Sequence, residues 1–400
     1  MQITDLAQEQ KITPLFRLGF RPFFAFGALF SLLSILIWGG YLAGKISLNL
    51  YGGGTFWHMH EMIFGFVCAI VVGFLLTAVQ NWTGQRGLSG KPLLLLFLLW
   101  FAGRLVMLFP DILGQQLSGL IDIAFLPVAA TLLAMPIIKV KQTRNMFFVP
   151  LLLLFTLANI MMHLSITDSS VNQIMPSAYI AVMLVTLLMS IMAGRVTPMF
   201  TANGTQTTKV QPIPALELTT NVSLFLLVLS YFVHPFVEIP NTIKSALFLT
   251  AGISQMFRWL RWRPWITFGV PLLWSLHSAL FFIWFGLIML GIGHIFDTFP
   301  LNHVWHLLTI GGMGGLILAM ISRVTLGHTG RALQPPKIMN FAFILMLIAT
   351  MSRVFGPWFM PESYSAFINF SVLCWFSSYG IFVIKYGPML LTPRKDGRPG

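Results

Sequence analysis

Histidine side chains collect at one end of the apolar runs in this sequence, and their chemistry is the most informative feature of the chain. The densest group is Trp57-His58-Met59-His60-Glu61-Met62, at the start of a long apolar run. A second group, Asn302-His303-Val304-Trp305-His306, opens another apolar run late in the chain. Neutral imidazole is a common ligand of haem and copper, and an imidazole inside a bilayer usually marks a metal, haem or proton site. The two groups therefore predict metal or haem ligands on two helices at matching depth.

The spacing within each group limits what its members can ligate. His58 and His60 are two residues apart, so on a regular helix they point about 200° apart and serve different centres unless one lies in an unwound start. His303 and His306 are three apart and share a face, so both address one centre or one orients the other. Glu61 is adjacent and is a hydrogen-bond acceptor or a proton relay for a ligand.

Further histidines and two arginines complete the candidate set. His163 is an additional candidate metal ligand, and His277, inside a later apolar run, is a ligand, a proton-path residue or a hydrogen-bonded packing group. Arg104 and Asp122 lie at similar depth in neighbouring apolar runs, so an ion pair is expected between them. Arg104 and Arg353 are alternative anchors for haem propionates, since a guanidinium binds a carboxylate with two hydrogen bonds.

Composition places these residues in a membrane protein. The 400 residues are 56% hydrophobic and 9% charged, which is too few charges for a water-facing surface. Apolar runs of at least about 17 residues, the length that spans a bilayer, cover 21–44, 56–79, 91–109, 117–138, 146–165, 174–194, 217–234, 241–257, 270–293, 303–323, 338–356 and 364–385. No stretch of the sequence alternates apolar and polar residues in the pattern of a β-strand. The predicted fold class is an all-α polytopic membrane protein with about twelve transmembrane helices.

The distribution of positive charge predicts the orientation. The net charge of +13 would suit nucleic acid, but most of the 24 lysines and arginines fall in segments on the amino-terminal side of the bilayer. The positive-inside rule then places both termini in the cytoplasm, and no nucleic-acid partner is expected. Seven of the nine histidines come to the outer face: His58, His60, His163, His234, His294, His303 and His306. Taken alone, His234 and His294 are typical of interfacial residues.

Short connections favour one compact transmembrane domain over 21–385, with a polar cytoplasmic linker at 201–214, a basic tail at 386–400 and an interfacial segment at 1–20. Arg17 and Arg21 are expected to anchor the start of the chain at the headgroups.

The second, sixth and tenth predicted helices end in similar short sequences. His60 precedes Gly84 by the same spacing that separates His306 from Gly330. The recurrence predicts three quasi-repeats of four helices.

The chain resembles the NnrS family of bacterial nitric-oxide-response membrane proteins over nearly its whole length. The resemblance rests on Phe20-Arg21-Pro22-Phe23-Phe24, Trp57 to Phe66, Ala102-Gly103-Arg104, Gly194-Arg195-Val196-Thr197-Pro198, Trp274-Ser275-Leu276-His277 and Leu326-Gly327-His328-Thr329-Gly330-Arg331. It implies an inner-membrane protein that contains haem and copper and accompanies denitrification or nitrosative stress. Because no Cys-x-x-Cys-His occurs, the haem would be a noncovalently held haem b.

A more distant similarity is to the catalytic subunit of haem-copper oxidases, which also has twelve helices in three groups of four and haem-ligating histidines on helices two and ten. His60 and His306 match those positions. That family has a His-x-His pair on helix ten, where this chain has His303-x-x-His306, and its double histidine on helix seven is replaced by His234 alone. An oxidase-like binuclear centre is therefore not expected.

The sequence hypothesis is a haem protein that binds nitric oxide or handles its iron-bound forms. His60 and His306 are the first candidate haem ligands. The expected partners are nitric oxide, the lipid bilayer and a membrane or periplasmic electron donor. One alternative is an oxidoreductase that reduces nitric oxide at a haem-metal centre, for which Glu61 or His277 would carry protons. Another is a secondary transporter, which repeats and intramembrane charges also suit.

Overall fold

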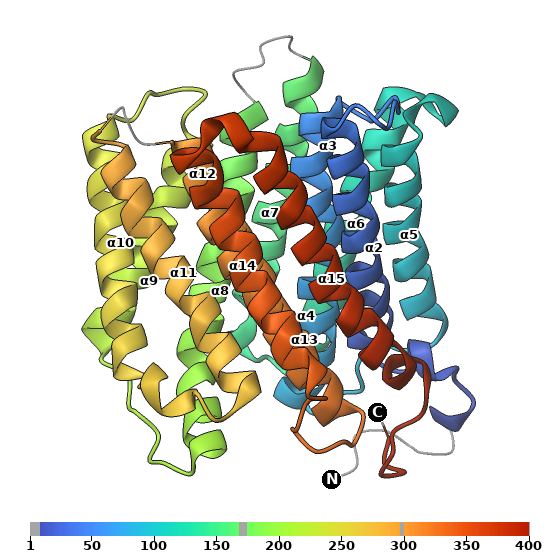
Figure 1. Cartoon of the computed structure of the whole chain (residues 1–400). Helices are drawn as coiled ribbons and strands as arrows, with labels where there is room; N and C mark the ends of the chain where they lie inside the picture. Colours follow the sequence, from blue (N-terminus) through green and yellow to red (C-terminus); the bar gives the residue numbers. More distant parts are fainter. Residues whose placement is uncertain (1–8, 168–173, 297–299, 400) are drawn as a thin grey trace. The chain divides into compact units, whose positions relative to one another are not determined.

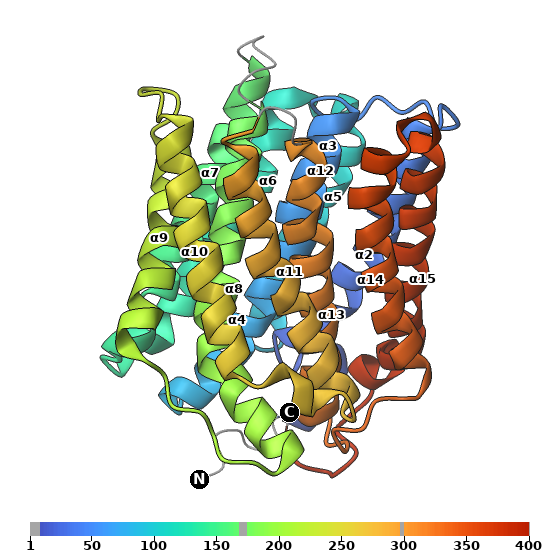
Figure 2. The ribbon, with the colours of Figure 1, turned by 60° about the vertical axis from the view of Figure 1, so that its left-hand side comes forward.

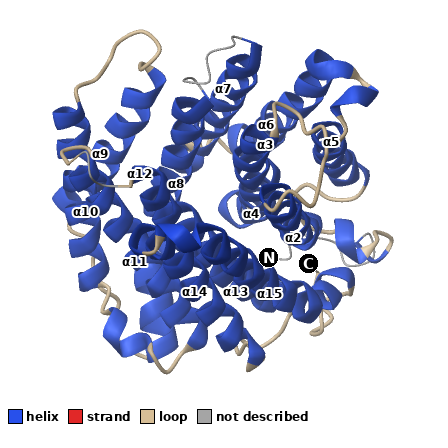
Figure 3. Ribbon diagram, turned by 45° about the horizontal axis from the view of Figure 1, so that its top comes forward, coloured by secondary structure: helices blue, strands red, loops and turns tan. Residues whose placement is uncertain are grey.

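The computed structural model describes residues 9–167, 174–296 and 300–399, and within these ranges the chain is helical with no strand (Figure 3). Backbone groups inside a bilayer must be satisfied within their own segment, so the apolar runs form helices. The all-α prediction is confirmed.

The long helices follow the predicted runs closely. They are α2 (Phe20–Leu42), α3 (Gly54–His60) continuing through η2 (Glu61–Val67) into α4 (Cys68–Thr83), α5 (Lys91–Leu108), α6 (Gly114–Lys139), α7 (Phe148–Thr167), α8 (Ile174–Thr205), α9 (Pro214–Phe232), α10 (Asn241–Arg261), α11 (Pro271–Gly293), α12 (Leu301–His306) continuing through η7 (Leu307–Gly314) into α13 (Gly315–His328), α14 (Ile338–Phe359) and α15 (Tyr364–Leu391). Among the described residues, eleven segments are long and apolar enough to cross a membrane. The helix outside that set is α10, which buries polar side chains, Lys244, Gln255 and Arg258, against its neighbours.

The chain forms two compact units. Unit 1 comprises residues 1–178, 324–333 and 379–400, and unit 2 comprises residues 179–323 and 334–378. In unit 1, α6 packs against α4, α5 and α7, and α2 packs against α4. In unit 2, α10 packs between α9 and α11, and η7 packs against α11 and α14 (Figure 1, Figure 2).

Each of the two histidine-bearing helices changes its winding at the histidine. His60 is the last α-helical residue before the π-helix η2, and His306 is the last before the π-helix η7. A π-helix is rare and occurs mostly at functional sites, because the wider turn shifts side chains relative to a regular helix. This shared feature agrees with the predicted correspondence of the second and tenth helices.

The helix ends support the repeat less evenly. Gly84 and Gly330 both take a left-handed conformation after α4 and α13, with φ of 66° and 70°, which is the usual glycine stop. In contrast, α8 runs past the predicted end at residue 194 to Thr205, and the left-handed residue is Gln206, with φ of 54°. The polar stretch 201–214 therefore begins inside a helix, and Gly204 is not a stop.

One of the two amino-terminal arginines, Arg21, does not lie where the sequence predicts. Of the predicted segment 1–20, residues 1–8 lie outside the described chain. Arg21 is fully buried, and its Nη1 donates to the carbonyl oxygens of Leu390, at 3.0 Å, and Thr392, at 2.8 Å. These are carbonyls at the end of α15, where a cation is favourable. The expected headgroup anchor is thus wrong for Arg21, which caps a helix that extends into the predicted 386–400 tail.

Candidate metal centre

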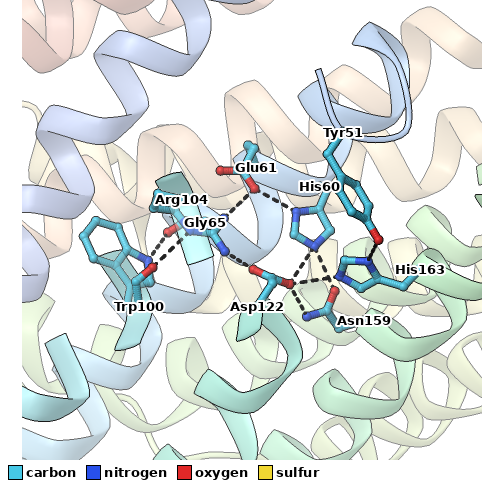
Figure 4. Close-up of polar contacts among 9 residues, drawn as sticks. All are labelled: Tyr51, His60, Glu61, Gly65, Trp100, Arg104, Asp122, Asn159 and His163. Carbon is cyan, nitrogen blue, oxygen red and sulfur yellow. Dashed lines mark hydrogen bonds and ion pairs between the residues drawn. The ribbon is translucent and has the colours of Figure 1, made fainter. Parts of the chain in front are cut away.

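His60 lies at the centre of a buried polar cluster in unit 1. Its side chain has no exposure, and its ring packs between the rings of Phe56 and Phe64, at centroid distances of 5.5 and 5.1 Å. Nδ1 lies 2.8 Å from Glu61 Oε1, and Nε2 lies 2.9 Å from Asn159 Oδ1 (Figure 4). His58, two residues earlier, instead stacks on Trp38 at 4.5 Å. The two histidines therefore have different neighbours.

Two carboxylates and one guanidinium meet beside His60. Arg104 Nη1 donates to Glu61 Oε1 at 2.5 Å, and Arg104 Nη2 donates to Asp122 Oδ1. The second contact confirms the predicted ion pair between α5 and α6. Asp122 Oδ2 faces His60 Nε2 at 3.1 Å. Glu61 Oε2 is buried and accepts no hydrogen bond, so one oxygen of this carboxylate is left for a proton or a cation.

The third side of the cluster comes from α7 and from the loop before α3. His163 Nε2 donates to Asp122 Oδ2 at 3.1 Å, and Asn159 Nδ2 donates to the same oxygen at 2.8 Å. His163 Nδ1 accepts from the Tyr51 hydroxyl at 2.9 Å. Burial, with a smaller contribution from the Asp122 charge, raises the pKa of Tyr51 to about 12. The phenol therefore stays protonated. Its hydroxyl can donate to Nδ1, or accept from Nδ1–H when Nε2 holds a metal, so it orients His163 in both states.

Three of these side chains are placed as metal ligands would be. His60, Asp122 and His163 each offer one ligand atom, and these atoms lie within 4.8 Å of one another. Typical metal–ligand distances of 2.0–2.2 Å place neighbouring ligand atoms about 3.3 Å apart. Small side-chain rotations would close the set around one ion. Two imidazoles and a carboxylate suit iron, copper or zinc.

The charges in the cluster favour a cation. Arg104 faces both Glu61 and Asp122, so one positive charge opposes two negative ones. An uncompensated charge is expensive in a low-dielectric interior. Both nitrogens of His60 face acceptor oxygens, and a proton on each would make the ring the second positive charge. A metal ion beside Nε2 would replace one of these protons and supply positive charge at the same place.

Glycines make room for the cluster. A Cβ at Gly65, in η2, would lie 2.6 Å from Arg104 Nη1, and one at Gly119 would lie 3.0 Å from the Tyr51 hydroxyl. The carbonyl of Gly65 accepts a hydrogen bond from Trp100 Nε1 at 2.8 Å. The π-helix and α5 are therefore held at a distance that only glycine permits.

The model of the NnrS protein family matches residues 14–394 of this chain. The chain belongs to the NnrS family. Comparison with curated proteins gives no match. Membership makes this a membrane protein of the nitric oxide response in general, and the buried histidine–aspartate–histidine group of this NnrS protein suits the metal and haem binding for which the family is known.

The predicted residues of unit 2 lie in different surroundings from His60. Arg353 Nη1 donates to His303 Nδ1 at 2.7 Å. His306 Nδ1 donates to Asn302 O at 3.0 Å, which leaves the lone pair of the neutral ring on Nε2. Because His60 and His306 belong to separate units, their joint ligation of one haem stays a prediction, as does propionate binding by Arg104 and Arg353.

Two further histidines of this NnrS protein make contacts within unit 2. His277 Nε2 lies 2.9 Å from the Thr201 hydroxyl, and His294 Nδ1 donates to Leu290 O at 2.8 Å. Sequence reasoning missed two members of the cluster, Tyr51 and Asn159. The four-residue spacing of Asn159 and His163, which puts both on one face of α7, was an available signal for the second. Nothing local marks Tyr51.

Proposed function

We propose that this NnrS protein binds a transition metal at the cluster of His60, Asp122 and His163, and that nitric oxide binds at its metal centre. The observation that carries the proposal is the convergence of two imidazoles and a carboxylate, all buried, from three helices of a membrane protein. Natural membrane helices rarely carry such residues without a function.

The surrounding side chains supply what a metal ligand needs. A ligating histidine usually has its other nitrogen oriented by a carboxylate or another polar group. Glu61 takes this role for His60 Nδ1, and Tyr51 takes it for His163 Nδ1. Iron and copper, both suited to these ligands, also bind nitric oxide. The burial of the site excludes water that would compete for the metal.

We also propose that haem b belongs to the complete protein, in line with the resemblance, in a bacterial inner membrane with both termini cytoplasmic. His306 suits an axial ligand because the hydrogen bond of Nδ1 to Asn302 O presents Nε2 as the ligating nitrogen. His60 is either the second axial ligand, as the matching helices predict, or a ligand of the separate ion.

Three variants separate these assignments. His60→Ala, His163→Ala and His306→Ala are purified from membranes and compared by optical spectrum and metal analysis. If His60 and His163 hold a separate ion, both variants lose that ion, and only His306→Ala changes the haem spectrum. If His60 and His306 ligate one haem, those two variants convert a six-coordinate spectrum and His163→Ala does not. Wild-type protein with neither metal nor haem would refute the proposed function.

A further inference from the structure

Unit 2 contains a cavity that the metal centre does not explain. Its volume is about 530 Å³, and it lies where α10 ends, η6 (Pro264–Thr267) crosses and α11 begins. This volume falls in the usual range of small-molecule sites, about 300–1,000 Å³. The cavity lies wholly within one unit.

Six aromatic rings line the cavity. They belong to Trp259, Trp265, Phe268, Trp274, Phe281 and Phe282. The Trp259 indole is fixed by a hydrogen bond of 2.9 Å from Nε1 to the carbonyl oxygen of His277. Flat apolar walls of this kind favour a flat apolar ligand, because ring stacking adds to the burial of apolar area.

His277 is the one titratable side chain on the wall. It is 2% exposed, its Nε2 is bonded to Thr201, and its Nδ1 makes no hydrogen bond. Whichever tautomer the ring adopts, Nδ1 keeps one unused capacity, as donor or as acceptor. A buried polar atom without a partner costs free energy, about 1–3 kcal/mol, that a ligand oxygen would recover.

The wall also indicates which ligands do not fit. No lysine or arginine lines the cavity, so it offers no partner for a phosphate headgroup or for haem propionates. Trp265 and Phe268 are 56% and 76% exposed, and on a membrane protein such exposed rings at the end of a helix lie toward lipid. A ligand would therefore enter from the bilayer.

We infer that this cavity binds the ring of a membrane quinone or quinol, with His277 Nδ1 hydrogen-bonded to one ring oxygen. A quinone carbonyl accepts from a protonated Nδ1, and a quinol hydroxyl donates to an unprotonated one, so the site suits both forms. The apolar tail of such a molecule extends into lipid past Trp265 and Phe268. The inference concerns binding alone and is independent of the metal centre.

The test uses the full-length protein in lipid nanodiscs with decylubiquinone and menadione as probes, and binding is followed by tryptophan fluorescence. Wild-type protein should show saturable quenching. His277→Phe, which keeps a ring but removes the hydrogen bond, should weaken binding by roughly 3- to 10-fold, and His277→Gln should restore part of it. Ser278→Trp, which fills the cavity, should abolish saturable binding. His234→Phe, outside the cavity wall, is the matched control.

A measurement on unmodified protein covers the case in which a variant fails to fold. A photoreactive azidoquinone should label peptides that contain the cavity wall, within residues 259–282 or 347–351, and excess decylubiquinone should compete. Labelling elsewhere, or equal quenching in wild type and all variants, would overturn the inference. So would loss of a haem spectrum in His277→Phe, because the cavity would then hold haem.

Discussion

At the scale of residues, the cluster in unit 1 is organised around Asp122. Its two oxygens receive Arg104, His60, His163 and Asn159. A single carboxylate therefore both balances a buried guanidinium and aligns two imidazoles. Because every contact is buried, removing the charge disturbs the stability of the fold as well as the site.

Asp122→Asn should therefore lose metal and stability together. The change keeps the shape of the side chain but leaves Arg104 with one carboxylate, and breaking a buried ion pair costs about 3–5 kcal/mol. We expect metal content near zero and a lower midpoint of thermal unfolding in detergent. Asp111→Asn is the control, because Asp111 is exposed and bonds Asn49. Full metal occupancy in Asp122→Asn would remove this residue from the ligand set.

Tyr51→Phe should weaken metal binding without unfolding the protein. The hydroxyl orients His163, and loss of such a supporting hydrogen bond costs about 10- to 100-fold in metal affinity. Since burial raises the pKa of Tyr51 to about 12, the phenol stays protonated at every pH well below that value, and its oxygen accepts from the Nδ1–H of a metal-bound His163. The ratio of the wild-type and variant affinities, measured by copper or zinc titration, should then be constant across neutral pH. A ratio that varies through this range would contradict a protonated Tyr51.

At the scale of elements, the π-helices following His60 and His306 are the distinctive feature. In η2, Glu61 bonds His60, and Gly65 lies against Arg104. In η7, Gly311 and Gly312 lie against Phe282 and Ile283 of α11. Glycine allows each π-helix to approach a neighbouring helix closely.

Gly65→Ala should separate η2 from α5. Its Cβ would lie 2.6 Å from Arg104 Nη1 and from Phe30 Cε1, and overpacking of this kind costs about 1–3 kcal/mol. We expect a lower unfolding midpoint and reduced metal content. Gly380→Ala is the control, because it meets nothing within 4 Å and alanine favours a helix. If both variants were as stable as wild type, η2 would tolerate side chains and the close approach would be unimportant.

At the scale of the whole molecule, eleven described segments are suited to cross a membrane, and the sequence predicts that most lysines and arginines lie in segments on one side of the bilayer. The positive-inside rule then predicts a cytoplasmic carboxyl terminus. A green fluorescent protein fused at the end of the chain should fluoresce, and alkaline phosphatase fused there should be inactive. Phosphatase fused after Gly52, in the loop before α3, should be active. The reverse pattern would invert the orientation.

Nitric oxide should bind without sustained turnover. Reduction would need protons and electrons at a buried centre, and Glu61 Oε2, the candidate proton acceptor, is buried and makes no hydrogen bond among the described residues. Anaerobic addition of nitric oxide to reduced protein should change the optical spectrum, while gas chromatography detects no continuing formation of nitrous oxide. Sustained formation that disappears in Glu61→Gln would establish a reductase.

Sequence alone determined the helices, the family and much of the candidate set. Apolar runs specify membrane helices because backbone groups inside a bilayer must form their hydrogen bonds within their own segment. The boundaries of α2 and α11 were therefore predictable. The ion pair of Arg104 with Asp122 was predictable because opposite charges at the same depth in a membrane usually pair.

Only the tertiary structure decided which of these residues meet. Tyr51, Asp122 and His163 are far apart in the chain, and their convergence on His60 depends on how α3, α6 and α7 pack. The change of winding at His60 was equally hidden, since the apolar run by itself does not distinguish a single π-helical turn from an α-helix. Helical periodicity gives the direction of a side chain on its own helix, but the packing of other helices determines which side chain it faces.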